Sequence, residues 1–164
     1  MQTKLSWKKN FFSGLYTIYS NSQQIGELKD VPFTQTATGE LNGKKYIFKA
    51  IGFFKQRTDI IDVAENKVIG VITYNDWMTK ASISVNNETI NWKYDNWLST
   101  KWSIFSSKGI KIQYSGSSTT GQIDSNVDDP LLLLSGLYVT NYYWQTTIAV
   151  LVAVFVPLWT VVLH

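Results

Sequence analysis

The sequence predicts a mainly β protein: a closed antiparallel barrel of about twelve strands around a hydrophobic C-terminal helix, with a further apolar C-terminal helical segment. Three observations support this prediction. Short stretches of alternating apolar and polar residues, separated by turn residues, run as far as residue 125. Parts of this pattern repeat 43 residues apart. Between Pro130 and Leu163 there is no Lys, Arg, Asp or Glu, and the chain there is strongly apolar.

The alternation is that of strands with one buried and one solvated face. In one such strand Ala81, Ile83 and Val85 alternate with Ser82 and Ser84. Turn residues separate the stretches at hairpin spacing, and Asn42-Gly43 in particular favours a tight type I′ turn. We count roughly eleven or twelve strands on this pattern.

The internal repeat favours a barrel over a propeller. Ile18, Ile61 and Ile104 are 43 residues apart, and two of the strands that follow them contain Ile-Gly, at 25–26 and 69–70. A period of this length also suits propeller blades of about four strands, but three blades are too few to close a propeller. A closed barrel leaves no exposed sheet edges.

A barrel of about twelve strands is too wide for its own side chains to fill, so it needs a ligand, a channel or a plug. Asp128-Asp129-Pro130 is typical of a helix start, with acids at the positive end of the dipole and Pro at the first turn. The stretch 131–144 is apolar on all sides and about 21 Å long as a helix. We therefore predict that residues 1–144 form the barrel domain, with a central helix at about 129–144.

The remaining segment, 145–164, is a candidate membrane anchor. Residues 146–163 would form a helix about 27 Å long, close to the thickness of a hydrocarbon core. Trp144 and Trp159 resemble the aromatic residues found at membrane interfaces. In the alternative arrangement, this segment fills the barrel and 131–144 packs elsewhere.

Composition excludes several kinds of chemistry. The chain has no Cys, and its one His is His164, which excludes thiolate sites and catalytic triads that need a His. Asp59 and Asp62 are three residues apart on a strand and so face opposite ways. There is no P-loop, dinucleotide fingerprint or nucleophile elbow. We predict no enzyme activity, no cofactor and no metal site.

Charge and the N-terminal residues bear on partners and location. The net charge of +3 is too small to indicate nucleic-acid binding. The basic residues at 4–9 are not followed by an apolar run, so we predict no signal peptide and expect the β-domain to lie in the cytosol.

Residues 44–57 hold a candidate lipid-binding surface. Aromatic residues are interleaved there with five cations, Lys44, Lys45, Lys49, Lys55 and Arg57, and no acid. Cations would bind headgroup phosphates while the aromatic rings lie at the interface. A strand pair with a solvated Lys face and a buried aromatic face explains the same pattern.

Four tryptophans, Trp77, Trp92, Trp97 and Trp102, lie within 26 residues of one another. Exposed, they would form a stacking platform for carbohydrate or single-stranded nucleic acid. Tryptophan on strands more often lies in a core or a barrel wall, and we expect that here.

Taken together, these features resemble the tubby C-terminal-like superfamily, which includes the phospholipid scramblases and the plant LURP-one-related proteins. The resemblance covers residues 11–144 and rests on the strand pairs at 16–28, 59–72 and 102–114, on Gly121-Gln122-Ile123, and on Asp128-Asp129-Pro130 with the four leucines that follow. It implies a twelve-stranded barrel threaded by a hydrophobic helix, with membrane phospholipid as a partner. The Pro-rich N-terminal region and Cys cluster of the scramblases are absent, which argues against scramblase activity.

Two functions are compatible with these features. The first is a non-enzymatic, membrane-associated barrel that binds phospholipid or a membrane partner, with a single-pass C-terminal anchor. The second is a lipocalin-like carrier that encloses a small apolar ligand. The position of residues 131–144 distinguishes them, because a helix that fills the lumen leaves no space for a carried ligand.

Overall fold

The computed structural model describes residues 2–32, 34–52 and 57–162, with side chains of the final helix described as far as Phe155. In this part of the chain, twelve strands precede one helix. The strands are β1 (Thr3–Lys9), β2 (Tyr16–Ser20), β3 (Gln23–Asp30), β4 (Thr36–Leu41), β5 (Lys44–Ile51), β6 (Arg57–Asp62), β7 (Lys67–Tyr74), β8 (Lys80–Val85), β9 (Glu88–Tyr94), β10 (Lys101–Phe105), β11 (Lys111–Gly116) and β12 (Thr120–Ser125), and the helix is α1 (Pro130–Val162).

The strands form a closed antiparallel barrel in which each strand pairs with its neighbours in the chain. β1 closes it by pairing with β2 on one side and with β12 on the other. The barrel predicted from the sequence is thus confirmed. The family resemblance, which begins at residue 11, does not include the strand that closes the barrel.

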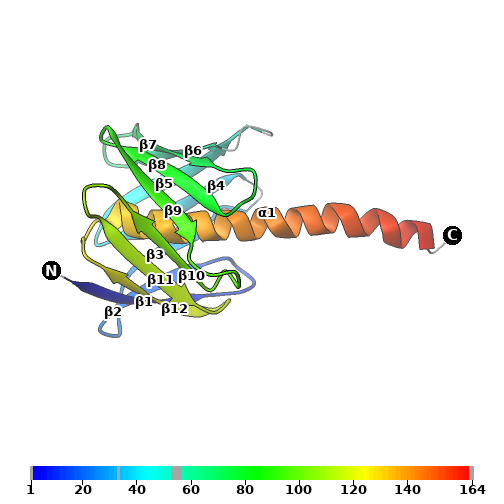
Figure 1. Cartoon of the computed structure of the whole chain (residues 1–164), viewed down its shortest axis with the longest axis horizontal. Helices are drawn as coiled ribbons and strands as arrows, with labels where there is room; N and C mark the ends of the chain where they lie inside the picture. Colours follow the sequence, from blue (N-terminus) through cyan, green and yellow to red (C-terminus); the bar gives the residue numbers. More distant parts are fainter. Residues whose placement is uncertain (1, 33, 53–56, 163–164) are drawn as a thin grey trace.

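Helix α1 runs through the barrel and then projects well beyond it (Figure 1). Asp129 begins the helix as predicted, since its Oδ1 accepts the backbone N–H groups of Leu131 and Leu132 at 2.9 and 3.3 Å. The helix is continuous to Val162, whereas its burial ends at Tyr143. The segments 129–144 and 145–164 are therefore distinguished by their surroundings and not by a break in the helix.

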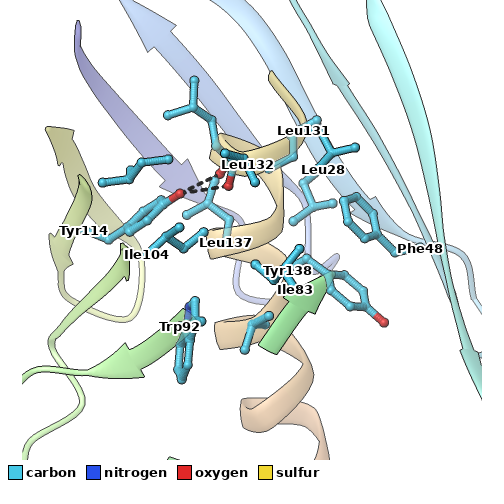
Figure 2. Packing of buried hydrophobic residues seen from close by; sticks show 14 of the residues in the cluster. Leu28, Phe48, Ile83, Trp92, Ile104, Tyr114, Leu131, Leu132, Leu137 and Tyr138 are labelled. Carbon is cyan, nitrogen blue, oxygen red and sulfur yellow. Dashed lines mark hydrogen bonds between the residues drawn. The ribbon is translucent and has the colours of Figure 1, made fainter. Parts of the chain in front are cut away.

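The first half of α1 fills the barrel. Leu133, Leu134 and Leu137 have no exposed surface, and α1 contacts β3, β4, β5 and β10 around the wall. Figure 2 shows side chains of the wall, Ile83 and Ile104 among them, converging on the helix. Packing of this kind leaves the barrel axis occupied by protein.

Gly136 is the point of closest approach between helix and wall. A Cβ atom at this position would lie 2.2 Å from the phenol of Tyr114. The carbonyl of Gly136 accepts the indole N–H groups of Trp92 at 3.2 Å and Trp102 at 3.1 Å. The Tyr114 hydroxyl donates to the carbonyls of Leu132 and Leu133 (Figure 2). These polar contacts fix the depth and rotation of the helix in the barrel.

The predicted repeat corresponds to three similar units of four strands: β2–β5, β6–β9, and β10–β12 with β1. An inward-facing isoleucine lies beside an aromatic residue of the preceding strand in each unit, and these pairs are Ile18 with Trp7, Ile60 with Phe48, and Ile104 with Trp92. The middle unit is thus matched by Ile60, not by Ile61 as the spacing of 43 predicted. The lengths of the turns differ between units, so a fixed period gives the wrong residue by one.

Candidate functional site

The two ends of the barrel differ, and the direction of α1 distinguishes them. The helix begins near Ser125, which pairs with Thr3 of β1; we call this the start end. It leaves beside Lys80 of β8, whose carbonyl accepts a hydrogen bond from the Tyr143 hydroxyl; we call this the exit end. Because neighbouring strands are antiparallel, each even-numbered strand begins at the exit end and each odd-numbered strand finishes there.

Large apolar side chains are exposed in the loops of the exit end. Phe12 is 96%, Trp77 is 84% and Trp97 is 89% exposed. With their neighbours Phe11 and Leu98, they form what we call the apolar rim. The start-end turns consist largely of Asn, Ser, Gly, Lys and acidic residues, as at 21–22, 42–43 and 86–87. The barrel therefore has one apolar end and one polar end.

The prediction for the tryptophans is confirmed for two and wrong for the other two. Trp92 and Trp102 lie buried in the barrel wall, whereas Trp77 and Trp97 lie in exposed loops between strands. The sequence did contain a signal, because Asp76 precedes Trp77 and Asn96 precedes Trp97, and such residues are typical of turns. Both tryptophans interrupt the alternation that Trp92 and Trp102 follow.

The predicted lipid-binding cations do not form a single cluster. Lys44 and Lys45 lie at the start end, beside the turn at 42–43, while Arg57 begins β6 at the exit end. Lys49 lies between them on β5, and Lys55 is outside the described residues.

The stretch 44–57 contains no acid. The fold nevertheless brings acids from neighbouring positions beside these cations. Glu40 pairs with Lys45 at 3.3 Å, and Asp59 accepts Arg57 Nη2 at 2.7 Å and lies opposite Lys49. Pairs that form across neighbouring strands cannot be identified from the order of the residues in the sequence. Of the predicted group, Arg57 is the described residue nearest the exit end, where Lys80 and Lys101 also begin strands.

A polar cluster that sequence reasoning missed lies where α1 leaves the barrel. Lys9 Nζ donates to Asn141 Oδ1 at 3.0 Å, and Asn141 Nδ2 donates to both carboxylate oxygens of Asp30 at 3.1 and 2.9 Å. Gln145 also donates to Asp30. Lys9 lies over the ring of Tyr16 at 5.0 Å. Burial lowers the pKa of Lys9, and the charge of Asp30 opposes this effect.

Both charges of this cluster depart from the three-unit pattern. Lys9 of β1 occupies the place of Ala50 in β5 and Tyr94 in β9, as the pairing with β2, β6 and β10 shows. Asp30 ends β3 in the same way that Tyr74 ends β7 and Gly116 ends β11. The equivalent positions of the other two units hold uncharged residues, so packing at the exit end does not require a charge at either position. We therefore treat the cluster as a candidate functional site.

The exit-end half of α1 is the second candidate feature. Ile148, Val150, Leu151, Val152, Val154 and Phe155 are all exposed, and they surround the helix. At about 1.5 Å a residue, the stretch 144–155 is roughly 18 Å long. Within the described residues, no helix meets the length and hydropathy needed to cross a membrane. The predicted anchor, 146–163, continues past the described side chains.

Two further acids noted in the sequence have structural roles. Asp62 accepts the backbone N–H of Glu65 at 3.1 Å in a turn, and Asp129 caps α1. In the part of the chain that the structure describes, no three His, Cys, Asp or Glu residues are grouped as metal ligands would be.

Comparison of the chain with protein-family models, with curated proteins and with solved structures found no match. The resemblance to the tubby C-terminal-like superfamily therefore stays a prediction, and the function has to be argued from the geometry of the exit end.

Proposed function

We propose that this protein is a non-enzymatic, membrane-associated barrel that attaches to phospholipid by its exit end. In this arrangement the exposed half of α1 enters the bilayer, the apolar rim lies at the interface, and the barrel stands on the membrane. The observation that favours it most is the coincidence of two apolar surfaces, the rim and the outer half of α1, at one end of the barrel. An exposed apolar surface of this extent is unfavourable in water and is typical of an interaction site.

The types of residue in the rim favour lipid over a protein groove. Trp and Phe are common where a protein meets the headgroup region, because their flat rings tolerate an environment apolar on one side and wet on the other. The described apolar stretch of α1, residues 148–155, is about 12 Å long, which is somewhat less than half of a hydrocarbon core of about 30 Å. The helix therefore reaches well past the depth of the rim.

Charge is complementary to an anionic membrane at this end. Arg57, Lys80 and Lys101 begin strands at the exit end, and all three are exposed. Each cation close to an anionic membrane surface contributes about 1 kcal/mol to attraction, and salt weakens this contribution. Arg57 contributes less, because it already forms an ion pair with Asp59.

The alternative function, a lipocalin-like carrier, requires space on the barrel axis. That axis is occupied by α1, whose side chains at Leu133 and Leu137 are fully enclosed. No observation favours the carrier, and we propose attachment to membrane phospholipid instead.

Vesicle flotation tests the proposal. The full chain should float with vesicles that contain anionic phospholipid, and brominated lipids should quench its tryptophan fluorescence. Trp77→Phe with Trp97→Phe should remove part of this quenching, while the buried Trp92 should contribute little. A chain that stays with the aqueous fraction as an oligomer would contradict the proposal, because its helices would then cover one another.

Charge variants separate the two ends of the barrel. Lys80→Gln with Lys101→Gln should weaken binding to anionic vesicles by roughly 30-fold, on the basis of about 1 kcal/mol for each cation. Lys44→Gln with Lys45→Gln, the matched pair at the start end, should leave it unchanged. The opposite result would place the lipid contact on the β4–β5 turn and overturn docking by the exit end.

A further inference from the structure

A groove at the exit end separates α1 from the barrel wall. Its volume is about 350 Å³, and the residues that line it include Lys9, Tyr16, Leu98, Thr140, Trp144 and Ile148. It lies between the apolar rim on the wall side and the exposed half of α1 on the other. A second groove, of about 560 Å³, borders α1 where Asp30, Tyr142 and Thr146 meet. Among the described residues that line them, the first groove has a cation, Lys9, and the second has an acid, Asp30, and no cation.

Lys9 has donors available in this groove. An ammonium group carries three donors, and its side-chain hydrogen bond among the described residues is the one to Asn141. No carboxylate in the described part of the chain lies within 4.0 Å of its Nζ. The nearby Asp30 accepts hydrogen bonds from Asn141 and Gln145 instead. A half-buried cation whose nearest acid is held at one remove, by Asn141, favours direct contact with an anion from outside the chain.

Trp7 provides an independent observation in the same groove. It lines the groove and is only 2% exposed, and its indole Nε1 has no hydrogen-bond partner among the described residues. Its counterpart in the second unit, Trp92, donates to the carbonyl of Gly136. Buried polar groups are nearly always paired in folded proteins. The indole N–H of Trp7 is thus a buried, unpaired donor in the wall of the groove that Lys9 also lines.

The groove continues outward along one face of the helix. Thr140, Trp144, Ile148, Leu151 and Phe155 follow one another at intervals of three or four residues, and such residues share a face of a helix. The first three line the groove, while Leu151 and Phe155 are exposed beyond it. An amphiphile with its head in the groove would therefore have an apolar track for its chains.

We propose that this groove holds one anionic phospholipid, with its phosphate at Lys9 and its acyl chains along the face of α1 that contains Trp144 and Ile148. The proposal rests on the proposed function, because the bound chains would point into the same bilayer as the helix. The chain would then bind one specific phospholipid in addition to attaching to the membrane surface. The neighbouring groove with Asp30 would repel the same headgroup, so one lipid is expected for each chain.

Native mass spectrometry of the full chain tests this site directly. The chain would be released from detergent in the presence of phosphatidylglycerol and phosphatidylcholine in equal amounts. We expect one retained phosphatidylglycerol per chain. Lys9→Met keeps most of the volume of the side chain and removes its charge, and it should reduce retention by about tenfold, the effect of losing one charge-assisted contact. Lys4→Met, which removes an exposed cation of the same strand at the start end, is the matched control and should retain the lipid.

A second variant keeps the test informative if Lys9→Met does not fold. Thr140→Trp would fill the groove from the helix side without a change in charge, and it should also abolish retention. Equal retention of the two lipids by the natural chain, or retention by both variants, would overturn the site. In a parallel experiment with oleate added to the mixture, retention of oleate in place of phosphatidylglycerol would show that the ligand is not a phospholipid.

Vesicle flotation distinguishes this inference from the proposed function. Lys9→Met and Thr140→Trp should both float with vesicles as the natural chain does, because the rim and the outer half of α1 are intact. A chain that floats but retains no specific lipid would contradict the site alone. A chain that does not float would contradict the proposed function.

Discussion

At the scale of single residues, Gly136 shows how tightly the helix fits the wall. A methyl group there would overlap the ring of Tyr114, which is itself buried and hydrogen-bonded to α1. Neither partner can move without breaking the contacts of Trp92 and Trp102 with the same helical turn. A glycine in the middle of a helix weakens it, so its presence here reflects the close approach.

Gly136→Ala should therefore destabilise the barrel by about 3 kcal/mol or more, the upper range for overpacking a core. Gly39→Ala is the matched control. Its added methyl would meet the ends of two leucine side chains, Leu134 at 3.1 Å and Leu28 at 3.4 Å, and should cost less. Urea denaturation of both variants, followed by circular dichroism, measures the difference. Similar midpoints for the two variants would show that the helix can shift in the barrel.

At the scale of elements, α1 is one helix in two environments. A charge placed in the first half would be enclosed without a partner, whereas a charge in the second half would remain outside the barrel. Leu137→Lys should therefore prevent folding, since Leu137 has no exposed surface. Leu151→Lys, about four turns farther along the helix, should leave the fold intact. Near-ultraviolet circular dichroism, which reports the packed aromatic residues, distinguishes the two outcomes.

Truncation separates the halves more completely. A chain that ends at Gln145 keeps every described buried side chain of α1 and should fold as a water-soluble monomer. A chain that ends at Asp129 lacks the helix and should not fold, because the barrel would have no core. Size-exclusion chromatography and thermal unfolding measure both. Failure of the chain that ends at Gln145 to fold would assign residues beyond it to the core.

Much of this element could be predicted from the sequence, for a physical reason. Thirty or so residues without charge, preceded by Asp129 and beginning with Pro130, predict an apolar helix from composition and local capping alone. The polar cluster could not be predicted in the same way. Lys9, Asp30 and Asn141 are far apart in the chain, and only the closed register of the barrel brings them to one mouth. The apolar rim is likewise assembled from loops that each look ordinary alone.

At the scale of the whole molecule, buried tyrosines link stability to pH. Burial raises the pKa of Tyr94 and Tyr138 to about 12 each, and it raises the pKa of Tyr74 and Tyr114 well above the ordinary value. The unfolded chain loses these protons near pH 10, whereas the folded barrel keeps them. The stability they contribute is thus present below about pH 10 and is lost as pH rises towards 12.

We therefore expect the free energy of unfolding to fall steeply above about pH 10. Lys9 acts in the opposite direction, because its lowered pKa favours the folded state as pH rises, but it is one group against several. Urea denaturation at a series of alkaline pH values, with tyrosinate absorbance recorded alongside, measures the effect. Ionisation that precedes unfolding, or stability that does not change, would show that these phenols are accessible in the folded barrel.

The position of α1 after all twelve strands affects how the protein is made. The strands of the barrel are translated before the helix that fills it. A nascent chain that has reached residue 129 therefore contains the inward-facing residues of the wall but not the residues of α1 that they pack against. Such a chain cannot form its core while the ribosome still holds residues 130–143. Strands with exposed apolar faces are prone to aggregation, so the wall is at risk until residues 130–143 have emerged and can fill it.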